Sequence, residues 1–200
     1  VGAVVFGLLL WNLTANGPLL PWDAAAVAWF HAWATHSSPF MKWLMLTGSF
    51  IGQNGVIYLG VALGVFWIVN RQWHKVAMLV LGVGGCEAAY QILGGIIGRH
   101  RPVFPDPLEV LTGPGFPSGH TSAGLAFFGL LAYLLWPHLK TRWSKVAVVA
   151  LVTGLLLYIS VSRLFQGVHY PTDLLSGFAL GLAWSGLIYT PLEAASRGVG

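Results

Sequence analysis

The chain's clearest chemical signal is a histidine and an aspartate spaced four positions apart, His169 and Asp173. Pro171 lies between them and suits the first turn of a helix, which places Asp173 in that turn. A carboxylate at this spacing can orient an imidazole, as a nucleophile or general base requires. The alternative is a structural pair that stabilises a helix end, and this stretch taken by itself fits that alternative better.

A second stretch, residues 113–120, approaches an apolar segment through closely spaced glycines and prolines. Ser118 is expected to cap the helix that follows, and the free backbone N–H groups behind it form an anion site at a helix N-terminus. His120 would lie at the rim of that site. The alternative is that Ser118 only caps the helix and that His120 is a histidine at the membrane interface, with no anion bound. This stretch taken by itself favours that alternative.

Arginines accompany both stretches: Arg99 and Arg101 precede the second, and Arg163 precedes the first. A guanidinium offers a planar fork of donors that suits phosphate oxygens, although arginines at helix ends also reach toward lipid headgroups. The ends of four apolar segments bring these groups to one face of the protein. Arg101 and Arg163, together with a helix N-terminus, two histidines and a carboxylate, suit an anion that reacts, and phosphoryl transfer depends on such positioning and charge neutralisation.

The elements that position these residues are expected to be membrane-spanning helices. Of the 200 residues, 56% are hydrophobic and 8% are charged, whereas an ordinary soluble domain carries about 25% charged residues. This composition excludes a disordered chain, a nucleic-acid-binding domain and a typical cytosolic enzyme. A bilayer span needs about 20 mostly apolar residues. The candidate spans, several of which must extend into their flanks, are Val1–Leu13, Phe50–Val69, Val76–Gly98, Thr121–Trp136, Val146–Val161 and Leu174–Leu192.

We therefore predict an all-α fold, a polytopic membrane bundle of six transmembrane helices that forms a single domain over residues 1–200. An interfacial helical segment is expected between the first two spans, where Trp29, Phe30 and Trp33 recur at helical spacing. Asp23 is a plausible start for that helix. The aromatic face suits a helix lying at headgroup level, and an ordinary aromatic belt is the equal alternative.

The positions of Lys and Arg predict the orientation, because short cytoplasmic loops carry an excess of both. With six spans, one side receives the basic residues Arg71, Lys75, Lys140, Arg142, Lys145 and Arg197. That side is predicted to be cytoplasmic. The opposite side receives residues 99–120 and 162–173, so the reactive groups are expected on the outer, periplasmic or extracellular, face of a bacterial inner (plasma) membrane.

Glu87 and Gln91 are polar residues inside the third span, on the same helical face. An ionisable group at bilayer depth is costly and often functional. A structural interpretation is favoured, in which Glu87 faces the bundle as a protonated or hydrogen-bonded group and Gln91 bonds to another helix. The lone cysteine, Cys86, is expected to pack among apolar side chains.

The motifs resemble those of the type 2 phosphatidic acid phosphatase superfamily, which includes integral-membrane lipid phosphatases. Its pattern is Lys-x6-Arg-Pro, then Pro-Ser-Gly-His, then Ser-Arg-x5-His-x3-Asp. Here Arg101-Pro102 matches the end of the first motif, and residues 117–120 and 162–173 match the second and third in full. The departure is Gly94, which occupies the position of the family's phosphate-binding lysine. Arg99, slightly more than one helical turn away, could partly substitute for that lysine.

The resemblance implies a role for each matched residue. His169 would attack phosphorus to form a phosphohistidine, with Asp173 fixing the imidazole tautomer. His120 would protonate the leaving oxygen and then activate water. The phosphate oxygens would be held by Arg101, Arg163, the Ser118 hydroxyl and the Gly119 N–H, with Arg99 as a further candidate. The family requires no metal, and no cofactor is expected. Asp106 and Glu109 are expected to shape the first outer loop.

We therefore expect a metal-independent membrane lipid phosphatase whose partners are its phosphorylated lipid substrate and the surrounding lipids, not nucleic acid. Phosphatidic acid, phosphatidylglycerol phosphate, a polyprenyl diphosphate and a phosphorylated lipid A all remain possible substrates. One alternative is a lipid phosphotransferase that uses the same phosphohistidine, with a lipid hydroxyl in place of water. A second is a non-catalytic lipid-phosphate binder or transporter, favoured only by the missing lysine. The oligomeric state is left open.

Overall fold

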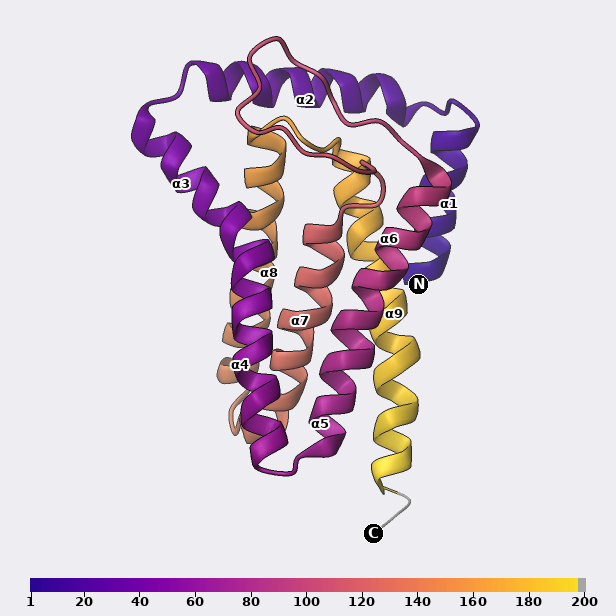
Figure 1. The fold of residues 1–200 in the computed structure, drawn as a ribbon, viewed down its shortest axis with the longest axis vertical. Coiled ribbons are helices and arrows are strands. Elements are labelled where there is room, and N and C mark those ends of the chain that lie inside the picture. Colours follow the sequence, from indigo (N-terminus) through magenta and orange to yellow (C-terminus); the bar gives the residue numbers. More distant parts are fainter. Residues whose placement is uncertain (198–200) are drawn as a thin grey trace.

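The computed structural model describes residues 1–197, and this part of the chain is helical apart from its connecting loops (Figure 1). The α-helices are α1 (Gly2–Thr14), α2 (Leu19–Thr35), α3 (Pro39–Phe50), α4 (Val56–Val69), α5 (Trp73–Ala77), α6 (Gly85–Ile97), α7 (Gly119–Leu135), α8 (Arg142–Phe165) and α9 (Pro171–Arg197). Two π-helical segments, η1 (Ile51–Gly55) and η2 (Met78–Gly84), and one 3₁₀ turn, η3 (Trp136–His138), complete the described helices.

The membrane bundle agrees with the predicted all-α fold. Within residues 1–197, five continuous helical stretches are long and apolar enough to cross a bilayer, and a bent pair of helices, α1 with α2, could supply a sixth span. The five stretches are Pro39–Val69, Trp73–Ile97, Gly119–His138, Arg142–Phe165 and Pro171–Ala194. As expected, they extend beyond the apolar cores read from the sequence. Helix α1 has 13 residues, about 20 Å of helix, so it falls short of a hydrocarbon core about 30 Å thick.

The aromatic segment between the first two spans is a helix, α2, which lies across the end of the bundle (Figure 1). It bends from α1 by 90°. Trp22 and Trp29 are more than half exposed on its surface, which suits a helix at the level of lipid headgroups. Asp23 is not its start, because the helix begins at Leu19 after Pro18 and Asp23 is buried one turn further on.

The π-helical segments η1 and η2 interrupt two of the spans, and the sequence analysis did not predict them. Both contain glycines, and π-helical turns often occur near functional sites. In η1, Gly52 lies where a β-carbon would be 2.7 Å from Ile159 and 3.3 Å from the ring of His120. The missing side chain therefore leaves room for His120 between η1 and α8.

Helices α7 and α9 hold the two main motifs together through close backbone contact. The Ser118 N–H donates to the Asp173 carbonyl at 2.9 Å, and the Thr121 hydroxyl donates to the Leu174 carbonyl at 3.2 Å. A β-carbon on Gly177 would lie 2.0 Å from the Thr121 Oγ1 and 2.5 Å from the Ser118 carbonyl oxygen. This approach depends on glycine at position 177 and places the starts of the two helices side by side.

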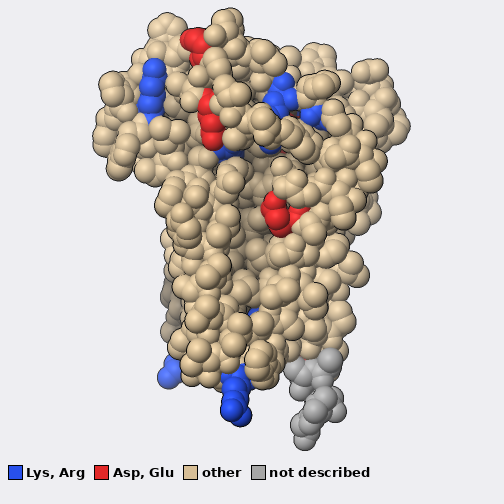
Figure 2. Space-filling model, viewed as in Figure 1, with Lys and Arg blue, Asp and Glu red and all other residues tan. Residues whose placement is uncertain are grey.

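The charged residues lie mainly at the two ends of the bundle, leaving most of its visible flank uncharged (Figure 2). Arg71 lies in the turn between α4 and α5 and Lys75 lies within α5, while residues 140–145 include the end of the η3–α8 connection and the first turn of α8, at the same end of the bundle (Figure 1). Helix α9 ends near them at Arg197, whose side chain lies outside the described residues. The basic residues thus gather opposite the loops that carry the motifs, as the sequence pattern indicated.

The packing predicts that Gly177→Ala lowers the melting temperature of the detergent-solubilised protein. The added methyl group must displace Thr121 or the α7 backbone, and overpacking of this kind costs about 1–3 kcal/mol. The matched control is Gly186→Ala in the same helix, where a β-carbon meets nothing within 4 Å. A melting temperature for Gly177→Ala equal to that of the control would contradict the proposed contact.

Candidate active site

The ring of His169 lies in the short loop between α8 and α9 and is only 1% exposed. Its Nε2 is 2.9 Å from Nη1 of Arg101, and its Nδ1 is 2.9 Å from the carbonyl oxygen of Gly115. An arginine can only donate, so Nε2 must be the acceptor and Nδ1 must carry the proton given to Gly115. This assignment leaves a lone pair on Nε2, the form a nucleophilic histidine needs.

The environment of His169 also favours the neutral imidazole. Burial removes the water that would solvate an imidazolium, and the guanidinium groups of Arg101 and Arg163 disfavour a further positive charge. Together they hold the pKa of His169 well below its ordinary value. His169 is therefore a neutral imidazole at neutral pH, with its one ring proton on Nδ1.

Asp173 lies beside His169 in the first turn of α9, as its spacing predicted, but it does not make the main hydrogen bond of the ring. Its Oδ2 is 3.5 Å from Nδ1 of His169, whereas the Gly115 carbonyl is 2.9 Å away. The same Oδ2 accepts the Tyr170 N–H at 2.8 Å. The loop carbonyl thus makes the shorter contact that orients the ring, and the sequence motif alone could not predict it.

Arg99 is engaged by two carboxylates, so the structure does not place it as a free phosphate ligand. Its Nη1 donates to Asp173 and to the Thr172 hydroxyl, and its Nη2 donates to Asp23 at 2.8 Å. The guanidinium also stacks over the Tyr170 ring, 4.3 Å from the centroid. Arg99 therefore neutralises the carboxylates behind His169, and its expected role as a substitute for the missing lysine has no support in this geometry.

Asp23 is a residue of the site that the sequence analysis missed. It is fully buried, and besides binding Arg99 it accepts the Thr172 N–H at 3.0 Å and the Thr172 hydroxyl. It thereby ties the interfacial helix α2 to the residue next to Asp173. The sequence does carry one sign of this role: Asp23 is a single carboxylate in an apolar, aromatic segment, and such a group requires a partner when it is buried.

Several buried polar atoms around His169 have no hydrogen-bond partner among the described residues. They are the Ser118 hydroxyl, Nε2 of His120, and Nε and Nη2 of Arg163. Ser118 occupies the predicted N-cap position of α7, but its hydroxyl makes no capping bond. An unsatisfied buried polar group costs about 1–3 kcal/mol. A tetrahedral anion at the α7 N-terminus would satisfy these groups together.

The remaining guanidinium nitrogen of Arg163, Nη1, contacts three neighbouring side chains. Its Nη1 donates to Glu109 at 2.9 Å, to the Gln166 side chain at 2.9 Å, and to the Ser49 hydroxyl. Glu109 therefore anchors the loop between α6 and α7 on the arginine, in agreement with its expected structural role. Asp106 acts similarly through His31, 3.0 Å away.

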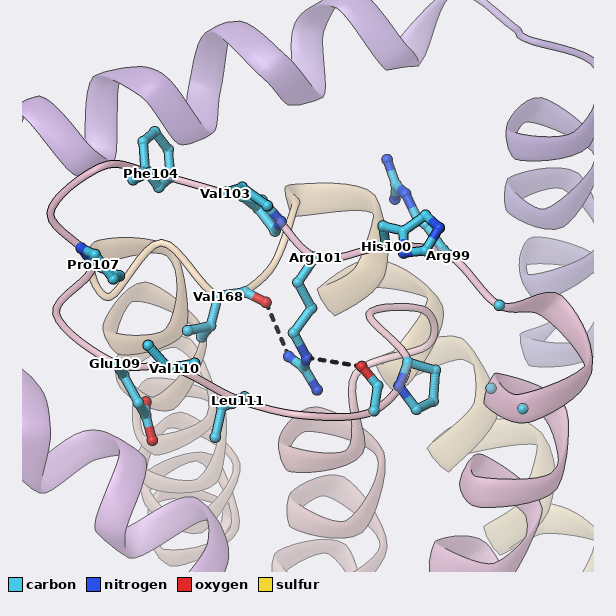
Figure 3. A pocket seen from close by; sticks show the side chains of 16 residues that line it. Arg99, His100, Arg101, Val103, Phe104, Pro107, Glu109, Val110, Leu111 and Val168 are labelled. Atoms are coloured by element: carbon cyan, nitrogen blue, oxygen red, sulfur yellow. Dashed lines mark hydrogen bonds between the residues drawn. The ribbon is translucent and has the colours of Figure 1, made fainter.

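Arg101 extends from the loop after α6 into the space that the loop encloses (Figure 3). It donates to the Val168 carbonyl at 2.9 Å and to the Gly113 carbonyl at 3.3 Å, and its Nη1 also reaches His169. Figure 3 shows Arg99 and His100 on the other side of the loop. The structure thus brings Arg101 to His169 and directs Arg99 away from it.

Gly94, which stands in place of the family's lysine in the first motif, packs closely against the loop that precedes α7. A β-carbon on Gly94 would lie 2.6 Å from Pro114 and 3.4 Å from the Phe116 carbonyl oxygen. A lysine at this position would require the loop that supplies Gly115 to shift. The phosphate site is therefore built without that cation.

The molecule is therefore an integral-membrane helical bundle in which a buried, neutral histidine lies among arginines and unpartnered polar groups. Comparison with known families then identifies the family to which it belongs. Residues 75–196 match the model of the PAP2 superfamily, so more than half of the chain is covered and the chain belongs to this superfamily.

Several of its relatives are lipid phosphatases by name. Phosphatidylglycerophosphatase B of Bacillus subtilis is 32% identical over 123 residues, 61% of this chain and 59% of that protein. Lipid A 4'-phosphatase of Bacteroides thetaiotaomicron is 29% identical over 161 residues, 72% of this chain and 66% of that protein. These matches therefore span about three fifths to two thirds of the relatives' lengths.

A solved structure extends the likeness to nearly the whole chain. The crystal structure of a transmembrane PAP2-type phosphatidylglycerolphosphate phosphatase from Bacillus subtilis has a TM-score of 0.78 and 26% identity. The match covers 98% of this chain and 96% of that one. The helical-bundle fold is thus shared along its length.

The site predicts that Asp23→Asn lowers kcat for phosphate release from a lipid phosphate about 10- to 100-fold with little change in KM. Asp23 touches no substrate-binding group, and its loss would let Arg99 and Asp173 shift, where small displacements are costly. The matched control is Asp106→Asn, which removes the same charge from a side chain that is 66% exposed. A kcat for Asp23→Asn within twofold of the control would contradict this role.

Proposed function

We propose that the protein is a membrane lipid phosphatase that transfers the terminal phosphoryl group of a lipid phosphate to His169 and then to water. The observation that carries the proposal is the group of unpartnered buried donors beside the neutral histidine: the Ser118 hydroxyl, His120 and two nitrogens of Arg163. They supply the hydrogen bonds that phosphate oxygens and a leaving oxygen require.

In the first step, Nε2 of His169 bonds to phosphorus while the bond from phosphorus to the leaving oxygen breaks. His120, which must be an imidazolium beside the bound phosphate, gives its proton to that oxygen and becomes neutral, so an alcohol or a phosphorylated lipid leaves. Arg101 turns from Nε2 to the phosphate, and Arg163, the Ser118 hydroxyl and the Gly119 N–H hold the other oxygens. In the second step, His120 takes a proton from water, whose oxygen bonds to phosphorus as the phosphorus–nitrogen bond breaks.

Nothing in this sequence of steps calls on a metal, so the proposal includes metal-independent activity. It also includes an active site on the outer face of a bacterial inner membrane, supported by the basic residues at the opposite end of the bundle. The phosphotransferase alternative differs only in the acceptor of the phosphoryl group. Release of inorganic phosphate, compared with transfer of ³²P to an added lipid alcohol, separates the two reactions.

We expect His169→Ala to lower phosphate release from a panel of lipid phosphates by about 10³-fold or more, because both steps pass through this nitrogen. The panel comprises phosphatidic acid, phosphatidylglycerol phosphate, a polyprenyl diphosphate and lipid A, assayed with purified protein in detergent and excess chelator. His100→Ala is the control, since His100 is an exposed histidine in the loop between α6 and α7.

Two results would contradict the proposal. One is near-parent activity of His169→Ala, which would remove the nucleophile. The other is loss of the parent's activity when a chelator is added and its recovery when a divalent metal is added, because the reaction would then require a metal. Binding of lipid phosphates without any phosphate release would favour the non-catalytic binder or transporter.

A further inference from the structure

A groove of about 840 Å³ runs from the active site down the flank of the bundle. Arg101, His120 and His169 line its upper part. Its lower part runs between α4 on one side and η2 with α6 on the other, with glycines and aliphatic side chains along the walls. A lipid phosphate bound at His169 would therefore extend its leaving group and apolar chain along this groove.

Glu87 and Gln91 form a hydrogen-bonded polar pair on the α6 wall of the groove, whose lower part is lined mostly by glycines and aliphatic side chains. The Gln91 amide donates to Oε1 of Glu87 at 2.9 Å, and no other hydrogen bond to the Glu87 carboxylate is found among the described residues. The expectation that Gln91 bonds to another helix is thus wrong, because the bond lies within α6. Figure 2 shows an acidic patch on this flank, apart from the charged groups at the loop end. The second carboxylate oxygen is available to a molecule in the groove.

The pair lies just below the phosphate site. Tyr90 packs at the start of α7, where a β-carbon on Gly119 would be 2.7 Å from its ring, and it lines the same groove as Arg101 and Glu87. Glu87 precedes Tyr90 by three residues, which is about 5 Å along the helix axis. The carboxylate therefore lies at the depth of the first atoms beyond the bond that is cleaved.

We propose that Glu87 and Gln91 form a leaving-group subsite that selects phosphomonoesters of uncharged lipid alcohols over lipid diphosphates. This inference rests on the proposed phosphatase function. A hydroxyl or amide N–H of the leaving group donates to the free oxygen of Glu87, and Gln91 offers its amide oxygen beside it. A leaving group that carries a second phosphate brings a negative charge toward the carboxylate in a groove of low dielectric, where repulsion is strong.

The test uses two substrates with the same isoprenyl chain, a monophosphate and a diphosphate, so that the pair differs only in the second phosphate. The readout is the ratio of kcat/KM for the diphosphate to that for the monophosphate, measured for the purified parent and Glu87→Gln. We expect this ratio to rise roughly tenfold in Glu87→Gln, since the repulsive charge is removed. The ratio in Glu87→Asp, which keeps the charge, is expected to stay near that of the parent.

Glu193→Gln is the matched control, because it makes the same charge change near the far end of α9 and is expected to leave the ratio unchanged. A ratio in Glu87→Gln within twofold of the parent would overturn the subsite while leaving the phosphatase in place. A rise in Glu87→Asp as large as that in Glu87→Gln would also overturn it, because packing and not charge would be responsible. A parent that releases phosphate from neither substrate overturns the proposed function and this inference with it.

Discussion

The shared arginine Arg99, bound by Asp23 on one side and by Asp173 on the other, is the interaction on which the rest of the site depends. All three side chains are at most 9% exposed. Charges in such an environment are tolerated only when they are paired and hydrogen-bonded, and removing one partner from a buried pair costs about 3–5 kcal/mol. Because the partners come from α2, the loop after α6 and α9, the network joins the interfacial helix to the catalytic loop.

This network gives the two arginines of the loop after α6 different partners. Arg99 is neutralised by carboxylates, whereas Arg101 donates to carbonyl groups and to His169 and keeps its charge for an anion. Arg163 is intermediate, since one nitrogen holds Glu109 and two others have no partner among the described residues. The site therefore offers positive charge at one place, next to Nε2 of His169. Glu87 lies further along the groove, where its partner is Gln91 and not an arginine.

Much of this architecture could be predicted from local features of the sequence. Apolar segments of nearly bilayer length gave the spans, and the N-cap position of Ser118 and the helical start at Pro171 follow from local backbone preferences. The motif residues His120, His169, Arg101 and Arg163 converge as their positions at the ends of spans suggested.

The parts that could not be predicted depend on contacts between residues distant in the sequence. Whether Arg99 meets a phosphate or Asp23 is decided by how α2 folds back over the bundle, 76 residues away in the chain. The carbonyl that holds His169 comes from Gly115 in a loop without regular structure, and no side-chain pattern encodes it. The π-helical segments η1 and η2 likewise have no local signal, since their sequences also suit an α-helix.

The most direct test of the central claim, that His169 carries the phosphoryl group, is a rapid-quench experiment on His120→Ala with a ³²P-labelled aryl phosphate. An aryl leaving group needs no proton, so the phosphoenzyme should form, while its hydrolysis slows without His120 as a base. The account predicts a protein-bound label that is acid-labile and alkali-stable and maps to His169. Absence of such a label while phosphate is released, or an equal label in a variant that also carries His169→Ala, would contradict it.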